Sequence, residues 1–422
     1  MKRLCVVGLG YIGLPTACLF ADSGLEVVGV DLSQSRLNEI ASGEALSDEP
    51  GMRELLRRVI DSGHLRVSSA PVAADAFILA VQTPVPSDHI PRLEALKAAA
   101  AEVGKLLRPG NLVVIESTVP PGATSGAVAS VLENASRLNA GKDFYLAYCP
   151  ERAIPGSTLR EMVNNDRLVG GVDRASTTMA THLYSRVVKG ELLATDASTA
   201  EVVKLSENTY RDVNIALANE LARLCEKSGA SVWEVVALAN RHPRVHLHQP
   251  GPGVGGSCLP KDPWFLVSSV PEQLELIPNA RRTNEEQPVL VAKKALGLLK
   301  QANVPKPPKV ALLGVAYKGG IGDVRETPAL PILAELRKNG AVVAAYDPHV
   351  QAFQDPLSSL DDALSGADLI MLVTDHPEMK RILPEKARAL VRTPLLFDTR
   401  NFLDHSLWRS HGFRVTVLGV GG

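Results

Sequence analysis

The sequence lacks the cysteine pattern of a disulfide-stapled or zinc-binding protein. Its 422 residues include five cysteines, which are scattered and nowhere form a Cys-x-x-Cys pair. A disulfide framework needs paired cysteines, and a structural zinc site needs closely spaced ligands. The composition therefore argues against both and fits a reducing cytosol. We predict a cytoplasmic protein without a metal site.

An excess of one charge and long apolar runs are absent as well. The formal net charge is −1, and no apolar run reaches the length of a membrane span. A surface that binds nucleic acid or an anionic membrane would carry a clear excess of Lys and Arg. The N-terminus leads directly into a strand, without the layout of a signal peptide. We therefore expect neither a nucleic-acid partner nor a membrane partner.

What the sequence does contain is a dinucleotide-binding fingerprint at its start. An apolar strand runs into Gly8-x-Gly10-x-x-Gly13, and a helical pattern and a second strand, Glu26–Val30, follow. In this fingerprint Gly8 makes the tight turn, Gly10 admits the pyrophosphate, and Gly13 lets helix and strand pack closely. Asp31 ends the second strand and should bind the ribose hydroxyls while repelling a 2′-phosphate. The pattern predicts a Rossmann unit that prefers NAD to NADP.

An α/β rhythm continues beyond the fingerprint. Continuous apolar runs, typical of a parallel sheet covered on both faces, predict strands at Ala76–Val81, Leu112–Glu116, Phe144–Tyr148 and Arg167–Gly170. Helical patterns lie around 50–61, 92–107, 124–134 and 174–188. Polar clusters follow three of the strands, where ligands bind in such folds; they are Gln82-Thr83-Pro84, Glu116-Ser117-Thr118 and Cys149-Pro150-Glu151-Arg152. Each cluster alone fits a proline-terminated strand end equally well, but three together favour a cleft lined by Thr118 and Glu151.

A long helix is predicted from about Asp196 to Lys227, ending before Gly229. It is apolar almost all round, which points to burial in a core or an interface. Lys204, Asn208 and Arg211 lie on one face, at i, i+4 and i+7. They form either a solvated polar stripe or part of a site.

The strongest turn signal is the stretch Gly251-Pro-Gly-Val-Gly-Gly-Ser-Cys258-Leu-Pro-Lys-Asp262. It follows a predicted helix, Val232–Ala239, and a loop with three histidines that lacks an acid or cysteine to complete a metal site. Glycine-rich backbone should deliver Cys258 at or near a helix N-terminus, where partial positive charge and Lys261 favour a thiolate. The alternative is a structural turn around an inert buried cysteine.

A second α/β unit is predicted after a helical segment, 280–302, and a proline linker, Lys306-Pro-Pro308. Its strands are expected at Lys309–Leu313, Val342–Tyr346, Leu369–Val373, Leu395–Asp398 and Val415–Leu418. The strand ends offer polar groups suited to a second phosphorylated ligand, unless they are ordinary surface charges: Lys318, Arg325, Asp347, Thr374 and Arg400.

Six motifs, in order, resemble the UDP-glucose/GDP-mannose dehydrogenase family over essentially the whole chain. They are Gly8-x-Gly10-x-x-Gly13, Glu116-Ser-Thr118-Val-Pro, Cys149-Pro-Glu151, Ala200-Glu-x-x-Lys204-Leu-x-x-Asn208, Gly253-Val-Gly-Gly-Ser-Cys258-Leu-Pro-Lys-Asp262 and Arg325-Glu-Thr-Pro328. The segments Tyr148–Arg152, Arg211–Ala216 and Asn240–Val245 look like its UDP-N-acetyl-D-mannosamine dehydrogenase branch. Ser257 and Lys261 look more like UDP-glucose dehydrogenases.

The resemblance implies an α/β chain in three parts: an NAD-binding Rossmann domain, 1–190, a central helical domain with the cysteine loop, 191–303, and a C-terminal Rossmann-like UDP-binding domain, 304–422. It implies four-electron oxidation of the C6 alcohol of a UDP-hexosamine to the uronate, with NAD as cofactor. UDP-N-acetyl-D-mannosamine is the expected substrate, UDP-N-acetylglucosamine or UDP-glucose the alternatives. A catalytically inactive nucleotide-sugar-binding protein is the non-enzyme alternative. The family's central helices also imply a homodimer or higher even oligomer, and the activity implies a place in polysaccharide biosynthesis.

The resemblance also implies roles for individual residues. Cys258 would form the thiohemiacetal and thioester, Lys204 and Asn208 would stabilise the oxyanion, and Asp262 or Glu151, with Thr118, would handle the hydrolytic water. Cofactor contacts are expected from Gly8, Gly10, Tyr11, Ile12, Gly13, Asp31, Arg36, Thr83 and Thr118. Substrate contacts are expected from Glu151, Arg152, Lys204, Asn208, Arg211, His242, Arg244, Gly255, Lys318 and Arg400, with Arg244 reaching the partner subunit's site.

Overall fold

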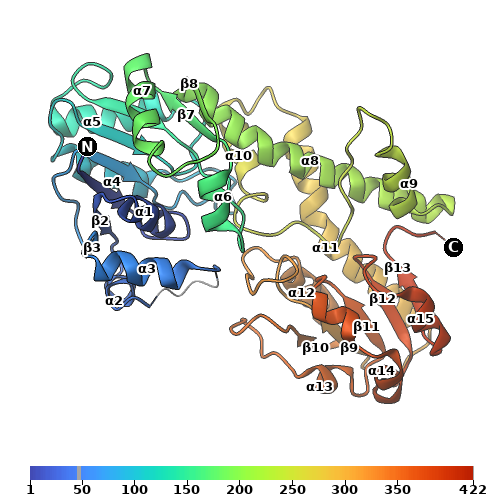
Figure 1. Cartoon of the computed structure of the whole chain (residues 1–422). Coiled ribbons are helices and arrows are strands. Elements are labelled where there is room, and N and C mark those ends of the chain that lie inside the picture. Colours follow the sequence, from blue (N-terminus) through green and yellow to red (C-terminus); the bar gives the residue numbers. More distant parts are fainter. Residues whose placement is uncertain (45–48, 422) are drawn as a thin grey trace. The chain divides into compact units, whose positions relative to one another are not determined.

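A computed structural model describes residues 1–44 and 49–421, which divide into two compact units (Figure 1). The first unit contains Met1–Glu207 and Trp264–Pro271, and the second contains Asn208–Pro263 and the chain from Glu272 onward. The boundary falls within the long helix α8 (Ala197–Ser228), which the sequence predicts to within a residue at each end.

The first unit is built on an eight-stranded sheet with the order β3-β2-β1-β4-β5-β6-β7-β8. Its strands are β1 (Arg3–Val7), β2 (Glu26–Val30), β3 (Leu65–Ser68), β4 (Ala76–Leu79), β5 (Leu112–Ile115), β6 (Tyr145–Tyr148), β7 (Arg167–Gly171) and β8 (Leu192–Asp196). The expectation of an all-parallel sheet is wrong at one place, because β6 and β7 pair antiparallel. An apolar strand buried on both faces has the same pattern in either direction, so periodicity does not report this reversal.

Helices cover both faces of this sheet. They are α1 (Gly13–Asp22), α2 (Gln34–Ala41), α3 (Met52–Asp61), α4 (Glu94–Gly104), α5 (Ala129–Ser136), α6 (Thr158–Asn164) and α7 (Arg174–Tyr184). The segment predicted as one helix over 124–134 opens with a π-helical turn, Thr124–Val128, before α5. Four short elements of the first unit, α2, α6, β3 and β8, were not predicted, because they are polar or half-exposed and lack a strong apolar period.

Alternate residues of the strands enter opposite cores. Leu4 and Val6 belong to one cluster, with side chains of α1, α3 and α7, whereas Cys5 and Val7 belong to another, with side chains of α4 and α5. Because both faces are covered, the strands are continuously apolar, and polar residues are confined to the strand ends.

The second unit carries a parallel five-stranded sheet with the order β10-β9-β11-β12-β13. Its strands are β9 (Lys309–Leu313), β10 (Val342–Tyr346), β11 (Leu369–Leu372), β12 (Leu395–Asp398) and β13 (Arg414–Val417). All five were predicted to within a residue or so. Its helices are α9 (Val232–Ala239), α11 (Leu276–Gln301), α12 (Ala329–Lys338), α13 (Leu360–Leu364), a 3-10 turn (Pro377–Arg381), α14 (Pro384–Leu390) and α15 (His405–Ser410). Helix α10 (Asp262–Ser269) begins in this unit, and its remainder groups with the first.

Within the described part of the chain, every helix is too short or too polar to cross a bilayer.

Candidate active site

The three glycines of the turn between β1 and α1 have the geometry that a dinucleotide site requires. Gly8 has a φ of +94°, and a Cβ there would lie 2.7 Å from the carbonyl oxygen of Ala80. A Cβ on Gly13 would lie 1.7 Å from the carbonyl oxygen of Gly8. Around Gly10, by contrast, no heavy atom of the described chain lies within 4 Å of the Cβ position. The turn therefore leaves room for a pyrophosphate at the N-terminus of α1.

Asp31, at the end of β2, accepts hydrogen bonds from this turn and can accept further ones. Its Oδ2 accepts from the N–H of Leu9 at 3.0 Å, and its Oδ1 accepts from the N–H of Ser33 at 2.9 Å. Arg36 donates from Nε to the carbonyl oxygen of Leu9 at 3.2 Å. A carboxylate offers about four lone-pair positions. The residues present therefore fit NAD, with Asp31 able to accept from ribose hydroxyls.

Tyr11 and Ile12 form the turn itself and present their backbone to the start of α1. The hydroxyl of Tyr11 lies 2.5 Å from Oγ1 of Thr158 and donates to Glu49 at 3.2 Å. Its side chain is therefore part of the fold of the first unit. Any contact of these two residues with a phosphate would come from their backbone N–H groups.

The predicted polar clusters follow three neighbouring strands. β4, β5 and β6 are adjacent and parallel, and β1 lies next to β4. Thr83, Thr118 and Glu151 therefore lie at the same sheet edge as Gly8. Thr83 and Thr118 are half-buried.

A buried arginine joins two carboxylates beneath this edge. Arg167, on β7, donates from Nη2 to Glu116 at 2.6 Å and pairs through Nη1 with Glu151. Glu116 also accepts from the hydroxyl of Tyr184 at 2.6 Å and from Thr16 at 3.0 Å. The other oxygen of Glu151 accepts the N–H groups of the two residues that follow it. Glu151 is thus fixed in place as an ion-paired carboxylate.

Burial and mutual pairing shift the pKa values of Glu116 and Arg167. It raises the pKa of the Glu116 carboxyl, while the charge of Arg167 and the hydroxyl of Tyr184 act in the opposite direction. Burial would lower the pKa of Arg167, but the charges of Glu151 and Glu116 more than offset it and raise that pKa. The arginine therefore stays charged, and it is what allows two acids to be buried together.

Three polar residues lie along one face of helix α8, and their exposure increases toward its C-terminal end. Lys204 is buried, Asn208 is half-buried and Arg211 is exposed, so the stripe is not simply a solvated face. One turn before Lys204, Glu201 accepts from the backbone N–H groups of Gly122 at 2.5 Å and Thr124 at 2.8 Å. This holds the loop after β5 to α8.

Arg152 has a structural role in the first unit. It pairs with Glu207 at 2.7 Å and also donates to the carbonyl oxygen of Asp166. Its guanidinium therefore links the loop after β6 to α8.

In the second unit, the glycine-rich stretch delivers Cys258 as predicted. Cys258 is exposed, and its carbonyl oxygen accepts from the N–H of Lys261 at 3.0 Å and of Asp262 at 2.8 Å, where α10 begins. The other four cysteines are buried. Cys258 therefore lies just before a helix N-terminus, as predicted, and it is exposed rather than buried.

Asp262 is placed beside the polar face of α8. It accepts from Nδ2 of Asn208 at 2.6 Å. Helix α8 and the first residue of α10 are thereby joined at the two residues that the resemblance places in the site.

A buried polar network fixes where the cysteine loop starts. The N–H of Gly251 donates to Asn219 at 3.0 Å, and its carbonyl oxygen accepts from Gln287 at 3.0 Å. Asn219 donates to Asn284, which in turn donates to Asp212 at 2.9 Å. Because these amides come from α8 and α11, the loop is tied to both helices.

The remaining predicted substrate residues lie in loops of the second unit. Lys318, His242 and Arg244 are exposed. Arg400 pairs with Asp375 at 3.0 Å, and a Cβ on Gly251 would lie 2.6 Å from its Nη1. Arg400 therefore connects the end of β12 with the start of the cysteine loop.

Sequence reasoning missed two residues that shape the site. Arg167 was treated only as the start of a strand, although an arginine opening an otherwise apolar strand is a signal of a buried ion pair. The second residue is Tyr317, which no sequence motif singled out. Its ring lies 3.0 Å from a Cβ built on Gly256, next to the cysteine. Burial and the charge of Asp323 raise the pKa of Tyr317 to about 12, and the charge of Cys258 adds to this.

Comparisons with known proteins agree with this arrangement. Three family models match in order: the NAD-binding domain of the UDP-glucose/GDP-mannose dehydrogenase family at residues 2–188, its central domain at 198–286 and its UDP-binding domain at 311–405. The UDP-N-acetyl-D-mannosamine dehydrogenase of Methanococcus maripaludis strain C7 is 42% identical over 428 residues, which cover 100% of this chain and 98% of the relative.

Solved structures show the same likeness. The structure of a UDP-D-ManNAc dehydrogenase from Pyrococcus horikoshii superposes with a TM-score of 0.92 at 43% identity, covering 99% of both chains. A UDP-glucose dehydrogenase from Pyrobaculum islandicum gives a TM-score of 0.85 at 28% identity, covering 99% of this chain and 96% of that one. With an NAD site, an exposed cysteine in its motif and three matching domains, this chain belongs to the UDP-glucose/GDP-mannose dehydrogenase family.

Proposed function

We propose that this protein oxidises the C6 alcohol of UDP-N-acetyl-D-mannosamine to the carboxylate in two successive two-electron steps. The observation that carries the proposal is Cys258, an exposed thiol at the start of α10, in a unit whose C-terminal part matches a UDP-binding domain. A simple alcohol dehydrogenase needs no such nucleophile, whereas oxidation of an aldehyde to an acid requires a tetrahedral adduct first.

In the first step the C6 hydroxyl gives up its proton to solvent and the carbon C6 gives up a hydride, so that the alcohol becomes an aldehyde. NAD⁺, when bound, supplies the hydride acceptor for both oxidations. Lys204 and Asn208, one helical turn apart on α8, would stabilise the negative oxygen with one charged and one neutral donor.

In the second step the Cys258 thiolate attacks the aldehyde carbon, and a C–S bond forms as the carbonyl becomes a thiohemiacetal. Loss of the hydride from that carbon, and of the hydroxyl proton to solvent, leaves a thioester. Water then adds to the thioester, the C–S bond breaks, and the acid and the thiolate are released.

We assign activation of the water to Asp262 rather than to Glu151, with Thr118 orienting it. Glu151 already accepts from Arg167 and from two backbone N–H groups, which hold its carboxylate in place within the first unit. Asp262 accepts from Nδ2 of Asn208, and its N–H donates to the carbonyl oxygen of Cys258 at 2.8 Å, which places it beside the residue that would carry the thioester.

Two features support the sugar assignment. One is the loop 241–248, which resembles the UDP-N-acetyl-D-mannosamine dehydrogenase branch, and the other is the surroundings of Lys261. Lys261 and Ser257 were the residues that looked more like UDP-glucose dehydrogenases. Lys261 pairs with Glu326 at 2.9 Å. The ammonium group of Lys261 is therefore paired with the loop that precedes α12. This makes Lys261 a weaker indicator of which sugar the site prefers.

Comparison of three sugars tests the proposal. A site built to hydrogen-bond the substituent at C2 rejects analogues strongly, because its polar groups are left unpaired. We expect kcat/KM to fall from UDP-N-acetylmannosamine to UDP-N-acetylglucosamine to UDP-glucose, with about tenfold or more between the first and last, and with two NADH formed per sugar. NADH release at 340 nm on each sugar, with the acid quantified, measures both. A preference for UDP-glucose, or one NADH with a free aldehyde, would contradict the assignment.

We also propose that the protein is a homodimer that works in the cytoplasm in polysaccharide biosynthesis, with Arg244 of one subunit reaching the partner's site. Tyr210, Leu217 and Leu224 recur every seven residues along α8 and are 52%, 44% and 61% exposed. A large apolar stripe at heptad spacing is the pattern of a helix that packs on another helix.

Replacing both leucines, Leu217→Glu and Leu224→Glu, should convert the dimer to a monomer. The buried charge would cost several kcal/mol per subunit, and sedimentation velocity would report the change in mass. A double variant at Leu276 and Leu383, which are exposed elsewhere, is the matched control. An unaltered protein that sediments as a monomer would rule the dimer out.

A further inference from the structure

The loop between β9 and α12, residues 314–328, contacts the cysteine loop along one side. The N–H of Gly256 donates to the carbonyl oxygen of Arg325 at 2.9 Å, and Lys261 pairs with Glu326 at 2.9 Å. Gly256 has a φ of +91°, and a Cβ there would lie 3.0 Å from the ring of Tyr317. Because only glycine leaves room for that ring, a shift of the 314–328 loop would be transmitted to the residues around Cys258.

On its other side the 314–328 loop is held by a buried carboxylate. Asp347, at the end of β10, accepts from the N–H groups of Val315 at 2.7 Å and Ala316 at 3.0 Å. It also accepts from the N–H groups of His349 at 2.9 Å and Val350 at 3.1 Å. Burial would raise its pKa, but hydrogen bonds from His376 and the backbone lower the pKa of Asp347 to about 2.

His376 completes this anchor with both of its ring nitrogens. Nδ1 accepts from the N–H of Gly320 at 3.0 Å, and Nε2 lies 3.0 Å from Oδ2 of Asp347. Nδ1 faces an N–H donor and Nε2 faces a carboxylate acceptor. This arrangement requires the neutral tautomer with its proton on Nε2. The imidazole is fully buried. It therefore holds the 314–328 loop at Gly320 directly and at its beginning through Asp347.

The two α/β units of the chain use their second-strand aspartates differently. Asp31 accepts two backbone N–H groups, which leaves room for ribose hydroxyls. Asp347 accepts five hydrogen bonds, from four backbone N–H groups and from His376, whereas a carboxylate offers only about four lone-pair positions, so its accepting capacity is fully used. The carboxylate that binds a nucleotide in a Rossmann unit is here committed to the protein's own loop.

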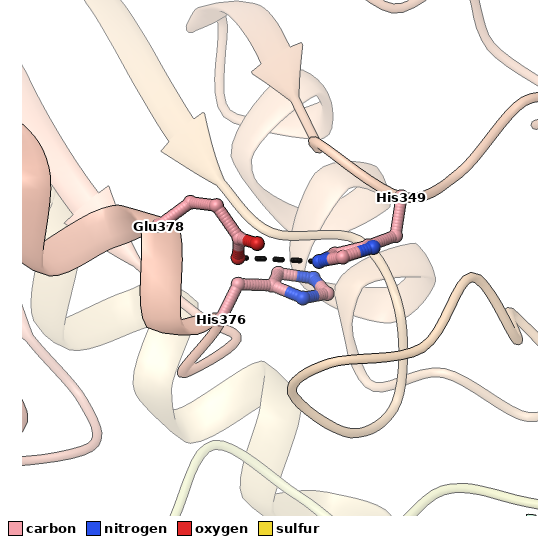
Figure 2. A group of neighbouring side chains, drawn as sticks. All are labelled: His349, His376 and Glu378. Carbon is pink, nitrogen blue, oxygen red and sulfur yellow. Dashed lines mark hydrogen bonds and ion pairs between the residues drawn. The ribbon is translucent and has the colours of Figure 1, made fainter. Parts of the chain in front are cut away.

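A metal site is the other interpretation of this region. His349, His376 and Glu378 offer ligand atoms that lie within 4.8 Å of one another (Figure 2). His349 faces Glu378, with 3.2 Å between Nε2 and Oε2, and its ring lies over that of His376 at 4.8 Å. Both nitrogens of His376 are already engaged, so a metal would have to displace Gly320 or Asp347. The hydrogen bonds favour a structural anchor over a metal centre.

We propose that His376 is a positioning residue that keeps the 314–328 loop against the cysteine loop, so that UDP bound in the C-terminal domain sets the reactivity of Cys258. The proposal rests on the proposed function, in which this domain binds the UDP of the substrate, and the 314–328 loop lies within residues 311–405, which match the family's UDP-binding domain. It adds that binding of the nucleotide and chemistry at C6 are coupled through one imidazole.

Two substitutions separate the two hydrogen bonds of His376. His376→Asn keeps an acceptor at the position of Nδ1, for Gly320, and gives up the donor to Asp347. His376→Gln keeps a donor near the position of Nε2 and gives up the acceptor for Gly320. His349→Gln, which changes the neighbouring imidazole and its exposed pair with Glu378, is the matched control.

The first measurement is UDP affinity by calorimetry, with NAD⁺ affinity as a check that each variant is folded. We expect His376→Gln to weaken UDP binding about tenfold, because the hydrogen bond from Gly320 to the buried imidazole is lost and the 314–328 loop is no longer held at Gly320. His376→Asn should stay within about threefold of the unaltered protein, since Asp347 keeps four backbone donors. His349→Gln should not change the affinity.

The second measurement is the rate at which iodoacetamide alkylates Cys258, with and without saturating UDP. Cys258 is the one exposed cysteine of the described chain, and burial raises the pKa of Cys5 to about 11 and of Cys18 to about 12, which leaves them unreactive. We expect UDP to change the rate severalfold in the unaltered protein and in His349→Gln, and the change to be mostly lost in His376→Gln.

A full UDP-dependent change in His376→Gln would overturn the positioning role, as would UDP binding to the unaltered protein with no change at Cys258. Failure of the unaltered protein to bind UDP would contradict the proposed function itself, and the inference with it. If the UDP-dependent change in alkylation rate is lost in His376→Gln but kept in His376→Asn, the contact with Gly320 carries the effect, and a general loosening of the core does not.

Discussion

Cys258→Ala should abolish formation of the uronate, with a fall in kcat of at least about 10³-fold, the scale expected for loss of a nucleophile. Without the thiol the aldehyde has no route to a tetrahedral adduct on the protein, so the second oxidation stops. NAD⁺ affinity should be nearly unchanged, because the dinucleotide turn of Gly8, Gly10 and Gly13 belongs to the first unit. Acid formation, followed by chromatography of the UDP-sugar products, is the measurement.

Cys258→Ser and Ser257→Ala serve as comparisons. Serine keeps the size of the side chain but is a much weaker nucleophile, so Cys258→Ser should also form little acid. The hydroxyl of Ser257 lies 3.5 Å from the sulfur, and its removal should have a far smaller effect. Turnover of Cys258→Ala at the rate of the unaltered protein would show that the cysteine is structural.

Arg167→Met should destabilise the protein by about 3 to 5 kcal/mol, the usual result of removing one partner from a buried ion pair. Glu116 and Glu151 would then share a buried site without a cation. The control is Arg58→Met, which removes a pair with Asp22 at 2.7 Å whose side chains are 59% and 39% exposed. A surface pair contributes at most about 1 kcal/mol, so the two variants should differ clearly in urea unfolding.

The Arg167→Met deficit should grow with pH. Burial already raises the pKa of Glu116 above 4.5, and loss of Arg167 removes the main opposing charge. A carboxyl whose folded pKa is raised favours the folded state below its unfolded pKa, and that contribution is lost as pH rises through the folded pKa. Unfolding at pH 5 and pH 8 should therefore show the smaller difference at pH 5. A deficit independent of pH would mean that lost packing, rather than unpaired charge, is the cause.

The sequence by itself determined the features that depend on neighbours along the chain. Strands such as Glu26–Val30 and Lys309–Leu313 were predicted at their observed bounds, because apolar runs this short, bounded by turn residues, favour a strand over a helix. The glycine turn at Gly8, the position of Cys258 before α10 and the length of α8 follow in the same way. Each depends on backbone freedom, capping or periodicity within about 30 residues.

Only the tertiary structure decided which distant polar groups meet. Arg167 lies 51 residues from Glu116, and His376 lies 56 residues from Gly320 and 29 from Asp347. Strand β7 also runs antiparallel to β6, although its apolar pattern is that of its parallel neighbours. Side-chain periodicity records that a residue is buried but not what it is buried against. Pairings of buried charges and the direction of a buried strand are therefore set by the packing of the whole sheet, and they place Glu151 against Arg167 and His376 beneath the 314–328 loop.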